Sequence, residues 1–452
     1  MLKNSSRTLP SGVIWICREI GAKRRTVRGR GGGAPRHYCT LVIASVLVSC
    51  AAAVGAFAQG AHLDRALAAL WSADNVSSRE DAADALARLG ADFDNLYQRL
   101  EAGPRYSKDV ETGLIEESRK GRNGLRQEYV FLVPEDYDPQ EKYRVSFYLH
   151  GGVNRAEPWK KGDPWWRRFD RSFGSEQISV FPSSWRGSLW WQSSQIENLE
   201  AILDRIKREY NVDENRVYLF GVSDGGTGVY YHAGKAPTPW AAILPFIGHP
   251  GVLDNPGTGV DGELFVENLT NRPFFVVNGE KDELYPVARV KPYLDAFERA
   301  GVEIVFHSQP GGHNTRWWNG EQEAIDAFLS SHPRNPLPDR LIWETERTDR
   351  FARIHWLVIE TLEEGAASGK VALSRKDNRV EVQTRGVARF RLLFSPRQFD
   401  LSQPIEVLTN GVSSYRGTVE RSPETLLRWT ARDNDRTMLF AAEVSIEVPS
   451  TR

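Results

Sequence analysis

The amino-acid sequence predicts an α/β fold in which a mainly parallel sheet is covered by helices on both faces. Two observations support this fold class. Strand-like and helix-like segments alternate between about residues 114 and 331, as in the βα units that build parallel sheets. Several of the strand-like runs, such as residues 217–220, are also almost wholly apolar, as strands buried on both faces are.

The 452-residue chain is long enough for two or three domains besides a leader. We predict a leader over residues 1–58, a helical lead-in over 59–110, an α/β domain over 111–333 and a β-rich accessory domain over 334–452. Leucines and alanines recur at three- and four-residue spacing in the lead-in, which indicates helices. The Pro-rich stretch HPRNPLPD separates the two larger domains.

Each element of the α/β domain follows from its apolar period. The predicted strands are QEYVFLV, RVSFYLH, ISVFPSS, RVYLFGV, AAILPFIG, PFFVVNG and VEIVFHS, and the predicted helices are residues 195–210, the segment after residue 223, 287–300 and 321–331. Beyond residue 340 the segments are short, alternate in polarity and are divided by turn residues, TLLRWTARD among them. That pattern predicts an antiparallel β-sandwich-like domain.

The leader has the features of a bacterial secretory signal. An apolar run over residues 41–58 follows the basic Arg36 and ends in A-F-A, which predicts cleavage after Ala58 and a secreted or periplasmic product. Two alternatives stay open. The residues up to Cys50 resemble a lipoprotein box, which would place a lipid anchor on that cysteine, and an uncleaved membrane anchor would use the same apolar run.

Composition narrows the classes of partner and cofactor. The chain beyond residue 58 holds 49 Lys or Arg and 58 Asp or Glu, and this negative balance argues against nucleic acid or an anionic membrane as a partner. All three cysteines, Cys17, Cys39 and Cys50, lie in the leader, so the rest has no disulfide or thiolate site. No metal-ligand cluster, phosphate loop or dinucleotide fingerprint is present in the sequence, and we therefore expect no cofactor and no metal.

One stretch carries the chemistry. In RVYLFGVSDGGTGVYY, a strand-like run leads into Ser223, and Gly221 and Gly225 flank that serine at two residues on either side. This G-x-S-x-G pattern is typical of a nucleophile elbow, a strained turn between a strand and a helix that needs small neighbours. A glycine-rich turn that happens to contain a serine is the alternative interpretation.

Two residues downstream complete a catalytic pattern. A serine hydroxyl needs a general base, and the base needs an acid that orients it. Asp282 follows the strand-like FFVVNG 59 residues after Ser223, and His313 lies in a glycine-flanked loop 31 residues further on. The order Ser, Asp, His, each just past a strand, predicts a hydrolytic triad.

The same pattern predicts an oxyanion hole. One donor is the backbone amide of Asp224, directly after the serine, and the other comes from Gly151 and Gly152 in YLHGGVN. The Asp224 side chain either caps the following helix or touches the substrate. His150 in the same run is interpreted as structural.

Four segments, FYLHGG, NVDENRVYLFGVSDGG, VVNGEKDELYP and GGHNTRWW, resemble the esterase D, feruloyl esterase and polyhydroxybutyrate depolymerase group of α/β hydrolases. The resemblance covers about residues 125–331. It implies an α/β-hydrolase fold, Ser223 as nucleophile, Asp282 as acid, His313 as base and two-step hydrolysis of a carboxylic ester. The helical lead-in and the C-terminal β region depart from that group, so the resemblance leaves the substrate open.

The expected substrate is a small-molecule or polysaccharide-linked ester. Tryptophans gather in the loops that follow strands, and we predict that Trp190, Trp191, His249 and Trp317 contact it. Two other functions stay open. A prolyl-oligopeptidase-like serine peptidase shares the motifs, but it usually carries a β-propeller for which residues 61–125 are too short. A non-catalytic carbohydrate-binding protein on a hydrolase scaffold is the second.

Overall fold

The computed structural model describes residues 60–167 and 176–449. The chain divides into residues 1–61 and residues 62–452, and the following description concerns the second part. The predicted cleavage after Ala58 and the lipid anchor on Cys50 lie outside the described residues. Over the described part of the chain, no helix has both the length and the apolar character needed to cross a membrane.

An eight-stranded sheet forms the centre of the α/β region, with the order β1-β2-β4-β3-β5-β6-β7-β8. The strands β3 to β8 pair in parallel, whereas β1, β2 and β4 meet in antiparallel pairs. This mainly parallel sheet confirms the predicted α/β-hydrolase fold. The strands are β1 (Gly113–Lys120), β2 (Arg126–Val133), β3 (Tyr143–Leu149), β4 (Gln177–Pro182), β5 (Val212–Val222), β6 (Ala242–Phe246), β7 (Phe274–Gly279) and β8 (Ile304–Gln309).

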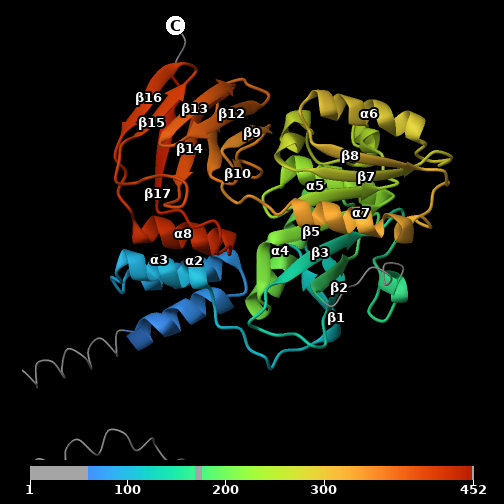
Figure 1. Ribbon diagram of the computed structural model, residues 1–452, viewed down its shortest axis with the longest axis horizontal. Coiled ribbons are helices and arrows are strands. Elements are labelled where there is room, and N and C mark those ends of the chain that lie inside the picture. The colour runs from blue at the N-terminus through green and yellow to red at the C-terminus, as the bar shows by residue number, and fades with distance from the viewer. Residues whose placement is uncertain (1–59, 168–175, 450–452) are drawn as a thin grey trace, which may run out of the picture. The chain divides into compact units, whose positions relative to one another are not determined.

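Helices cover both faces of this sheet, as Figure 1 shows. The helices α4 (Ser193–Glu209), α5 (Asp224–Lys235) and α6 (Val287–Arg299) bury their apolar residues with one set of strand side chains. The helix α7 (Trp318–Ser331) packs with the alternate set on the opposite face. Phe147 and Tyr148, neighbours in β3, belong to the two different cores, as the two-residue period of a strand requires.

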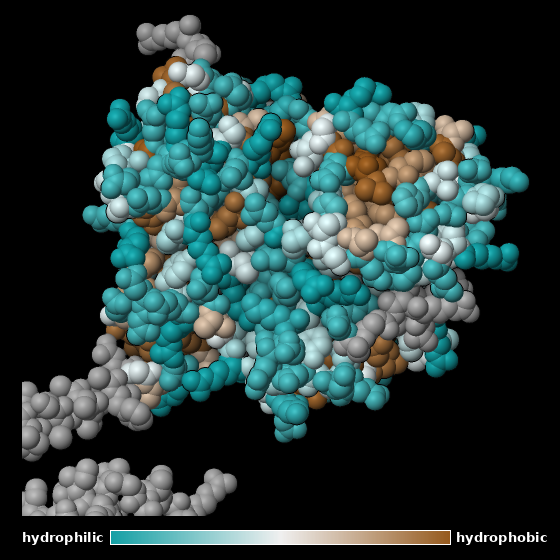
Figure 2. All heavy atoms as spheres, in the orientation of Figure 1, coloured by the Kyte–Doolittle hydropathy of each residue, from teal (hydrophilic) through white to brown (hydrophobic). Residues whose placement is uncertain are grey.

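The last parallel strand, β8, forms one edge of the sheet. Its residues Ile304, Val305 and Phe306 are only partly buried. In Figure 2 a hydrophobic patch interrupts the mostly hydrophilic visible face where β8 lies, between α6 and α7. The edge of the sheet is therefore one apolar area of this face.

The C-terminal region consists of two sheets, which confirms the β-sandwich-like architecture. A four-stranded sheet has the order β10-β11-β14-β17, and a five-stranded sheet has the order β16-β15-β13-β12-β9. All pairs are antiparallel except β13 with β15. The strands are β9 (Arg340–Thr345), β10 (Arg353–Ile354), β11 (Leu357–Leu362), β12 (Gly369–Lys376), β13 (Arg379–Arg385), β14 (Val387–Phe394), β15 (Ile405–Thr409), β16 (Val412–Gly417) and β17 (Ala442–Glu447).

One predicted strand of this region is wrong. TLLRWTARD belongs to the helix α8 (Pro423–Asp433). The Ser422 hydroxyl accepts a hydrogen bond from the Thr425 amide at 3.0 Å, and Pro423 occupies the first turn, where its missing N–H costs nothing. Leu426, Thr430 and their neighbours at helical spacing are buried. The capping serine and the proline outweigh the local alternation of polarity.

The helical lead-in packs against α8. It comprises helical residues 62–72, α2 (Val76–Ala87) and α3 (Phe93–Ala102). Their leucines form one apolar core with Leu426, Leu427 and Ala431 of α8. Residues far apart in sequence therefore share a core, and the lead-in serves packing in this arrangement. The predicted domain borders themselves stay predictions.

Buried ion pairs join the α/β region to the C-terminal region. The guanidinium of Arg436 lies 2.5 Å from the Glu214 carboxylate, with both side chains almost fully buried. Arg334, in the segment that follows α7, pairs with the buried Asp435 at 2.7 Å and also donates to Asn215 Oδ1 of β5 at 2.9 Å. Removal of one partner leaves the other charge buried and unpaired. Each single substitution is therefore expected to lower the free energy of unfolding by about 3–5 kcal/mol.

The same junction contains a buried histidine whose titration links stability to pH. His355 is fully buried, donates from Nδ1 to the Pro336 carbonyl and accepts from Arg272 at Nε2. Burial first, and then the charges of Arg272 and Arg334, hold the pKa of His355 well below its usual range. The unfolded chain therefore binds a proton that the folded protein does not, and stability falls as pH drops below about 6.5.

We expect His355→Gln to flatten that dependence. The wild-type free energy of unfolding should lose up to about 1.4 kcal/mol per pH unit from this group below about pH 6.5. Urea unfolding between about pH 8 and about pH 5 measures the slope. His62→Gln, at an exposed histidine, is the matched control and should keep the wild-type slope. Parallel slopes for His355→Gln and wild type would contradict the assignment.

Candidate active site

Ser223 occupies a sharp turn between β5 and α5. Its φ of 57° lies in the left-handed region, which a non-glycine residue rarely adopts. A Cβ on Gly221 would lie 2.1 Å from the Gly225 carbonyl oxygen, and a Cβ on Gly225 would lie 2.0 Å from the Leu149 carbonyl oxygen. Both flanking glycines are thus required sterically, as the elbow pattern predicts.

Three side chains from the carboxyl ends of three strands form a hydrogen-bonded chain. Ser223 Oγ lies 2.8 Å from Nε2 of His313, and His313 Nδ1 lies 2.7 Å from Oδ2 of Asp282. Ser223 follows β5, Asp282 follows β7 and His313 follows β8. This linear arrangement allows the imidazole to take a proton from the hydroxyl at one nitrogen while the carboxylate orients the other.

Several hydrogen bonds hold the Asp282 carboxylate in place. The Asp282 side chain is fully buried, and its Oδ1 accepts hydrogen bonds from the amides of Leu284 and Tyr285 at 2.9 and 2.8 Å. Its second oxygen is left for His313. These hydrogen bonds fix the orientation of the carboxylate toward the imidazole of His313.

The loop after β3 lies directly against the serine. A Cβ on Gly151 would lie 2.7 Å from Ser223 Cβ, so only glycine fits there. The amides of Gly151 and Gly152 have no acceptor within the described residues, and Asp224 is the first residue of α5, where an amide has no partner inside the helix. Within the described residues, free N–H groups from two elements are therefore available near Ser223.

Two features of this loop escaped the sequence analysis. The Asp224 carboxylate makes no capping hydrogen bond to α5. Its Oδ2 instead accepts a hydrogen bond from the Val153 amide at 3.0 Å. His150 donates from Nδ1 to the Gly151 carbonyl at 2.8 Å and accepts the Ser184 amide at Nε2 at 3.0 Å. The structural interpretation of His150 agrees with these contacts. Such long-range pairs leave no local signal in a single sequence.

The four residues predicted to contact substrate have different surroundings. Trp190 is fully buried and Trp191 is 5% exposed, and their indole N–H groups donate to the carbonyls of His150 and Thr258. In this arrangement these two rings support loops and offer no face to a ligand. His249 and Trp317 are half-buried, and Trp317 packs edge-on against Phe246.

Tyr285 is a further residue beside His313. Its ring lies 5.7 Å from the ring of His313 and 5.6 Å from that of His249, measured between centroids. Burial raises the pKa of the Tyr285 phenol and lowers the pKa of the His249 imidazole. The phenol is therefore protonated and the imidazole neutral near pH 7. Its hydroxyl has no hydrogen-bond partner in the described part of the chain. Its position three residues after Asp282 is the only signal that the sequence offered.

Replacement of Gly151 by alanine tests the close approach of the loop. The added methyl would meet Ser223 Cβ at 2.7 Å and the Val222 carbonyl at 3.0 Å, so serine or loop must move. Since small misplacements of reacting groups cost up to about 100-fold in rate, we expect kcat to fall at least about tenfold. Gly320→Ala is the control, because a Cβ there meets nothing within 4 Å. Equal ester turnover by the two variants would contradict the expected contact.

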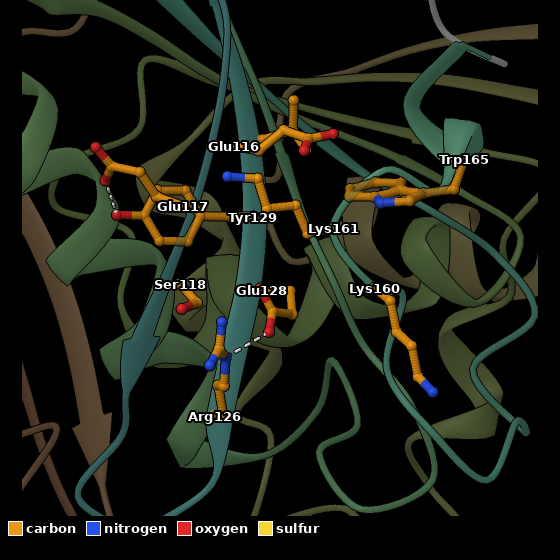
Figure 3. A pocket seen from close by; sticks show the side chains of 10 residues that line it. Glu116, Glu117, Ser118, Arg126, Glu128, Tyr129, Lys160, Lys161 and Trp165 are labelled. Carbon is orange, nitrogen blue, oxygen red and sulfur yellow. Dashed lines mark hydrogen bonds and ion pairs between the residues drawn. The ribbon is translucent and has the colours of Figure 1, made fainter.

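A cavity of 160 Å³ lies beside β1 and β2, and Ser223, Asp282 and His313 are not among the residues that line it. Figure 3 shows that its walls carry charges of both signs, with an ion pair between Arg126 and Glu128 and a hydrogen bond from Tyr129 to Glu117. The charges compensate one another within the wall. Among residues 60–167 and 176–449, no group of His, Asp and Glu side chains is arranged to hold a metal ion.

Comparisons with known proteins identify similar esterases. No family model matches the chain. A stretch of 180 residues is 26% identical to a "Bifunctional acetylxylan esterase/xylanase" of Neocallimastix patriciarum and spans 39% of this chain and 24% of the relative. A second stretch, of 142 residues, is 27% identical to a "Probable feruloyl esterase C" of Aspergillus terreus and spans 30% of this chain and 49% of that relative. The chain therefore spans less than half the length of these two relatives.

Solved structures similar to this one include esterases as well. A thermostable esterase is 21% identical, covers 49% of this chain and 63% of its own, and has a TM-score of 0.39. A ferulic acid esterase is 18% identical, covers 49% and 99%, and has the same TM-score of 0.39. The names of the two curated relatives confirm the resemblance to α/β-hydrolase esterases that the sequence motifs indicated.

Proposed function

We propose that this protein is an exported serine hydrolase that cleaves carboxylic esters through an acyl-enzyme. The observation that carries the proposal is the chain of hydrogen bonds from Ser223 through His313 to the buried Asp282. Unpaired amides beside the serine add support, since ester hydrolysis needs donors for a developing negative charge. The esterase names of the curated relatives point to the same reaction.

In the first step the ester carbonyl binds with its oxygen toward the amides of Asp224 and of the Gly151–Gly152 loop. Ser223 Oγ attacks the carbonyl carbon while His313 Nε2 takes the hydroxyl proton. The resulting imidazolium is stabilised by the Asp282 carboxylate 2.7 Å from Nδ1. His313 then gives its proton to the leaving alcohol oxygen, and the C–O bond of the ester breaks.

In the second step water replaces the alcohol. His313 takes a proton from the water, the hydroxide adds to the acyl-enzyme carbonyl, and the oxyanion is held by the same amides. Collapse of this intermediate releases the carboxylic acid and returns the proton from His313 to Ser223. The cycle needs no cofactor, because acid, base and nucleophile all come from the chain.

The substrate class is proposed as an acyl ester of a small alcohol or a polysaccharide. The printed names of the relatives include acetylxylan and feruloyl esterases. His249 and Trp317 are both half-buried and are the predicted contact residues that keep accessible surface. Export and cleavage after Ala58 rest on the apolar run and the A-F-A sequence of the leader.

Parallel assays separate this proposal from a peptidase. The purified protein should hydrolyse p-nitrophenyl acetate, and a panel of acetyl, feruloyl and hydroxyalkanoate esters should rank its acyl preference. Turnover of a peptide p-nitroanilide with no turnover of any ester would instead indicate a prolyl-oligopeptidase-like enzyme. Binding of polysaccharide without turnover of either would indicate a carbohydrate-binding protein.

A further inference from the structure

We infer that the Asp224 carboxylate is a positioning group that holds the Gly151–Gly152 loop in place as an oxyanion hole. One residue would then serve both halves of the hole, with its own amide as one donor and its side chain as the support of the other. The inference rests on the proposed function, because an oxyanion hole has a role only if Ser223 attacks an ester or a related carbonyl.

The contact that carries the inference crosses two elements. Asp224 opens α5 directly after the nucleophile, and its Oδ2 accepts the Val153 amide at 3.0 Å across 71 residues of sequence. Val153 follows Gly152 without a gap, so the bond fixes the chain immediately beyond the two glycines. Because Val153 donates to Asp224, its amide is occupied, while those of Gly151 and Gly152 stay free within the described residues.

The other supports of the loop act on its opposite end. His150 bonds to the Gly151 carbonyl and to the Ser184 amide, and Trp190 donates to the His150 carbonyl at 2.8 Å. These contacts hold residues 150 and 151 against the loop after β4. Burial of the Val153 side chain in the core fixes the position of that residue. The hydrogen bond to the Asp224 carboxylate fixes the orientation of the Val153 amide. Between these two fixed points lies only Gly152, whose amide stays free within the described residues.

The geometric tolerance of an oxyanion hole gives the bond its importance. Donors must lie about 2.7–3.1 Å from the oxyanion, and removal of one donor from such a hole costs about 100- to 1,000-fold in kcat. Without the bond to Asp224, the loop would still carry the amides of Gly151 and Gly152, but they would be less well oriented toward the oxyanion. We therefore expect Asp224→Ala to lower kcat about 10- to 100-fold.

Three variants and two measurements test the inference. Asp224→Asn keeps an acceptor oxygen for the Val153 amide, Asp224→Ala removes it, and Asp81→Ala alters an exposed aspartate on α2 as the control. Steady-state kinetics on p-nitrophenyl acetate give kcat and KM for each. Amide hydrogen exchange of the peptide that contains residues 150–153 reports the loop directly, and thermal unfolding verifies that each variant is folded.

For Asp224→Ala we expect faster exchange at Val153 and a lower kcat with little change in KM. For Asp224→Asn we expect the exchange rate and kcat to stay within a few-fold of the wild-type values. Unchanged exchange in Asp224→Ala would refute the support of the loop, whether or not the protein cleaves esters. A rise in KM at constant kcat would refute it in favour of direct contact with substrate. A wild type that cleaves no ester would refute the proposed function, and the exchange data would still decide the contact.

Discussion

Ser223→Ala should lower kcat for ester hydrolysis by about 10⁶-fold, since loss of the nucleophile of a hydrolytic triad removes the covalent pathway. The change deletes only Oγ, which accepts or donates one hydrogen bond at 2.8 Å to His313. Alanine keeps the Cβ that lies against Gly151 and can occupy the same strained turn. Stability is therefore expected to change little, and the loss of rate reports chemistry rather than folding.

Burst and steady-state assays with p-nitrophenyl acetate measure this effect, with the melting temperature recorded for each sample. Ser308→Ala is the matched control, because that hydroxyl lies on the edge strand β8 and bonds to Glu280 away from the triad. The control should keep wild-type turnover. Turnover by Ser223→Ala at more than a few per cent of wild type would mean that another group attacks the ester.

Asp282→Asn should lower kcat by about 10⁴-fold, as expected when the acid of such a triad becomes an amide. The carboxylate accepts the Nδ1 proton of His313 at 2.7 Å, which leaves Nε2 free to act as base toward Ser223. An asparagine NH₂ group at that position would donate to Nδ1 and favour the tautomer that carries its proton on Nε2. The imidazole then cannot take the proton of the serine.

The structure predicts that this loss appears in kcat far more than in KM, because Asp282 is fully buried and cannot contact substrate. Steady-state kinetics over a range of ester concentrations separate the two parameters. Glu280→Gln makes the same chemical change at an exposed position two residues earlier and should leave kcat and KM unchanged. A decrease of less than about tenfold for Asp282→Asn would contradict the role of the acid.

Much of the α/β region could be predicted from local sequence. The apolar runs before Ser223, Asp282 and His313 fix where strands end, and the carboxyl ends of parallel strands meet at one edge of the sheet. Glycine is required at residues 221, 225 and 151 for steric reasons that the motifs already contain. The mainly parallel sheet followed from this periodicity, the α/β-hydrolase fold from the motifs and the family resemblance that they carry, and the C-terminal sheets from their turn spacing.

The misses have physical causes that local pattern does not contain. α8 has an alternating stretch, but its capping serine and its contacts with the lead-in decide for a helix. The exposure of a tryptophan depends on what packs over it, so Trp190 is buried although it lies in a loop. The Asp224–Val153 bond and the approach of Tyr285 to His313 join residues that are distant in sequence.

The most direct test of the central assignment is covalent labelling of the wild-type protein with a fluorophosphonate, followed by mass spectrometry of the peptides. The account predicts one phosphonyl group per chain, located on Ser223, and no labelling of Ser223→Ala. Labelling should also slow strongly in His313→Ala, because the base would no longer take the serine proton. A folded wild-type protein that takes up no label, or takes it at another residue, would contradict the assignment of Ser223 as the nucleophile.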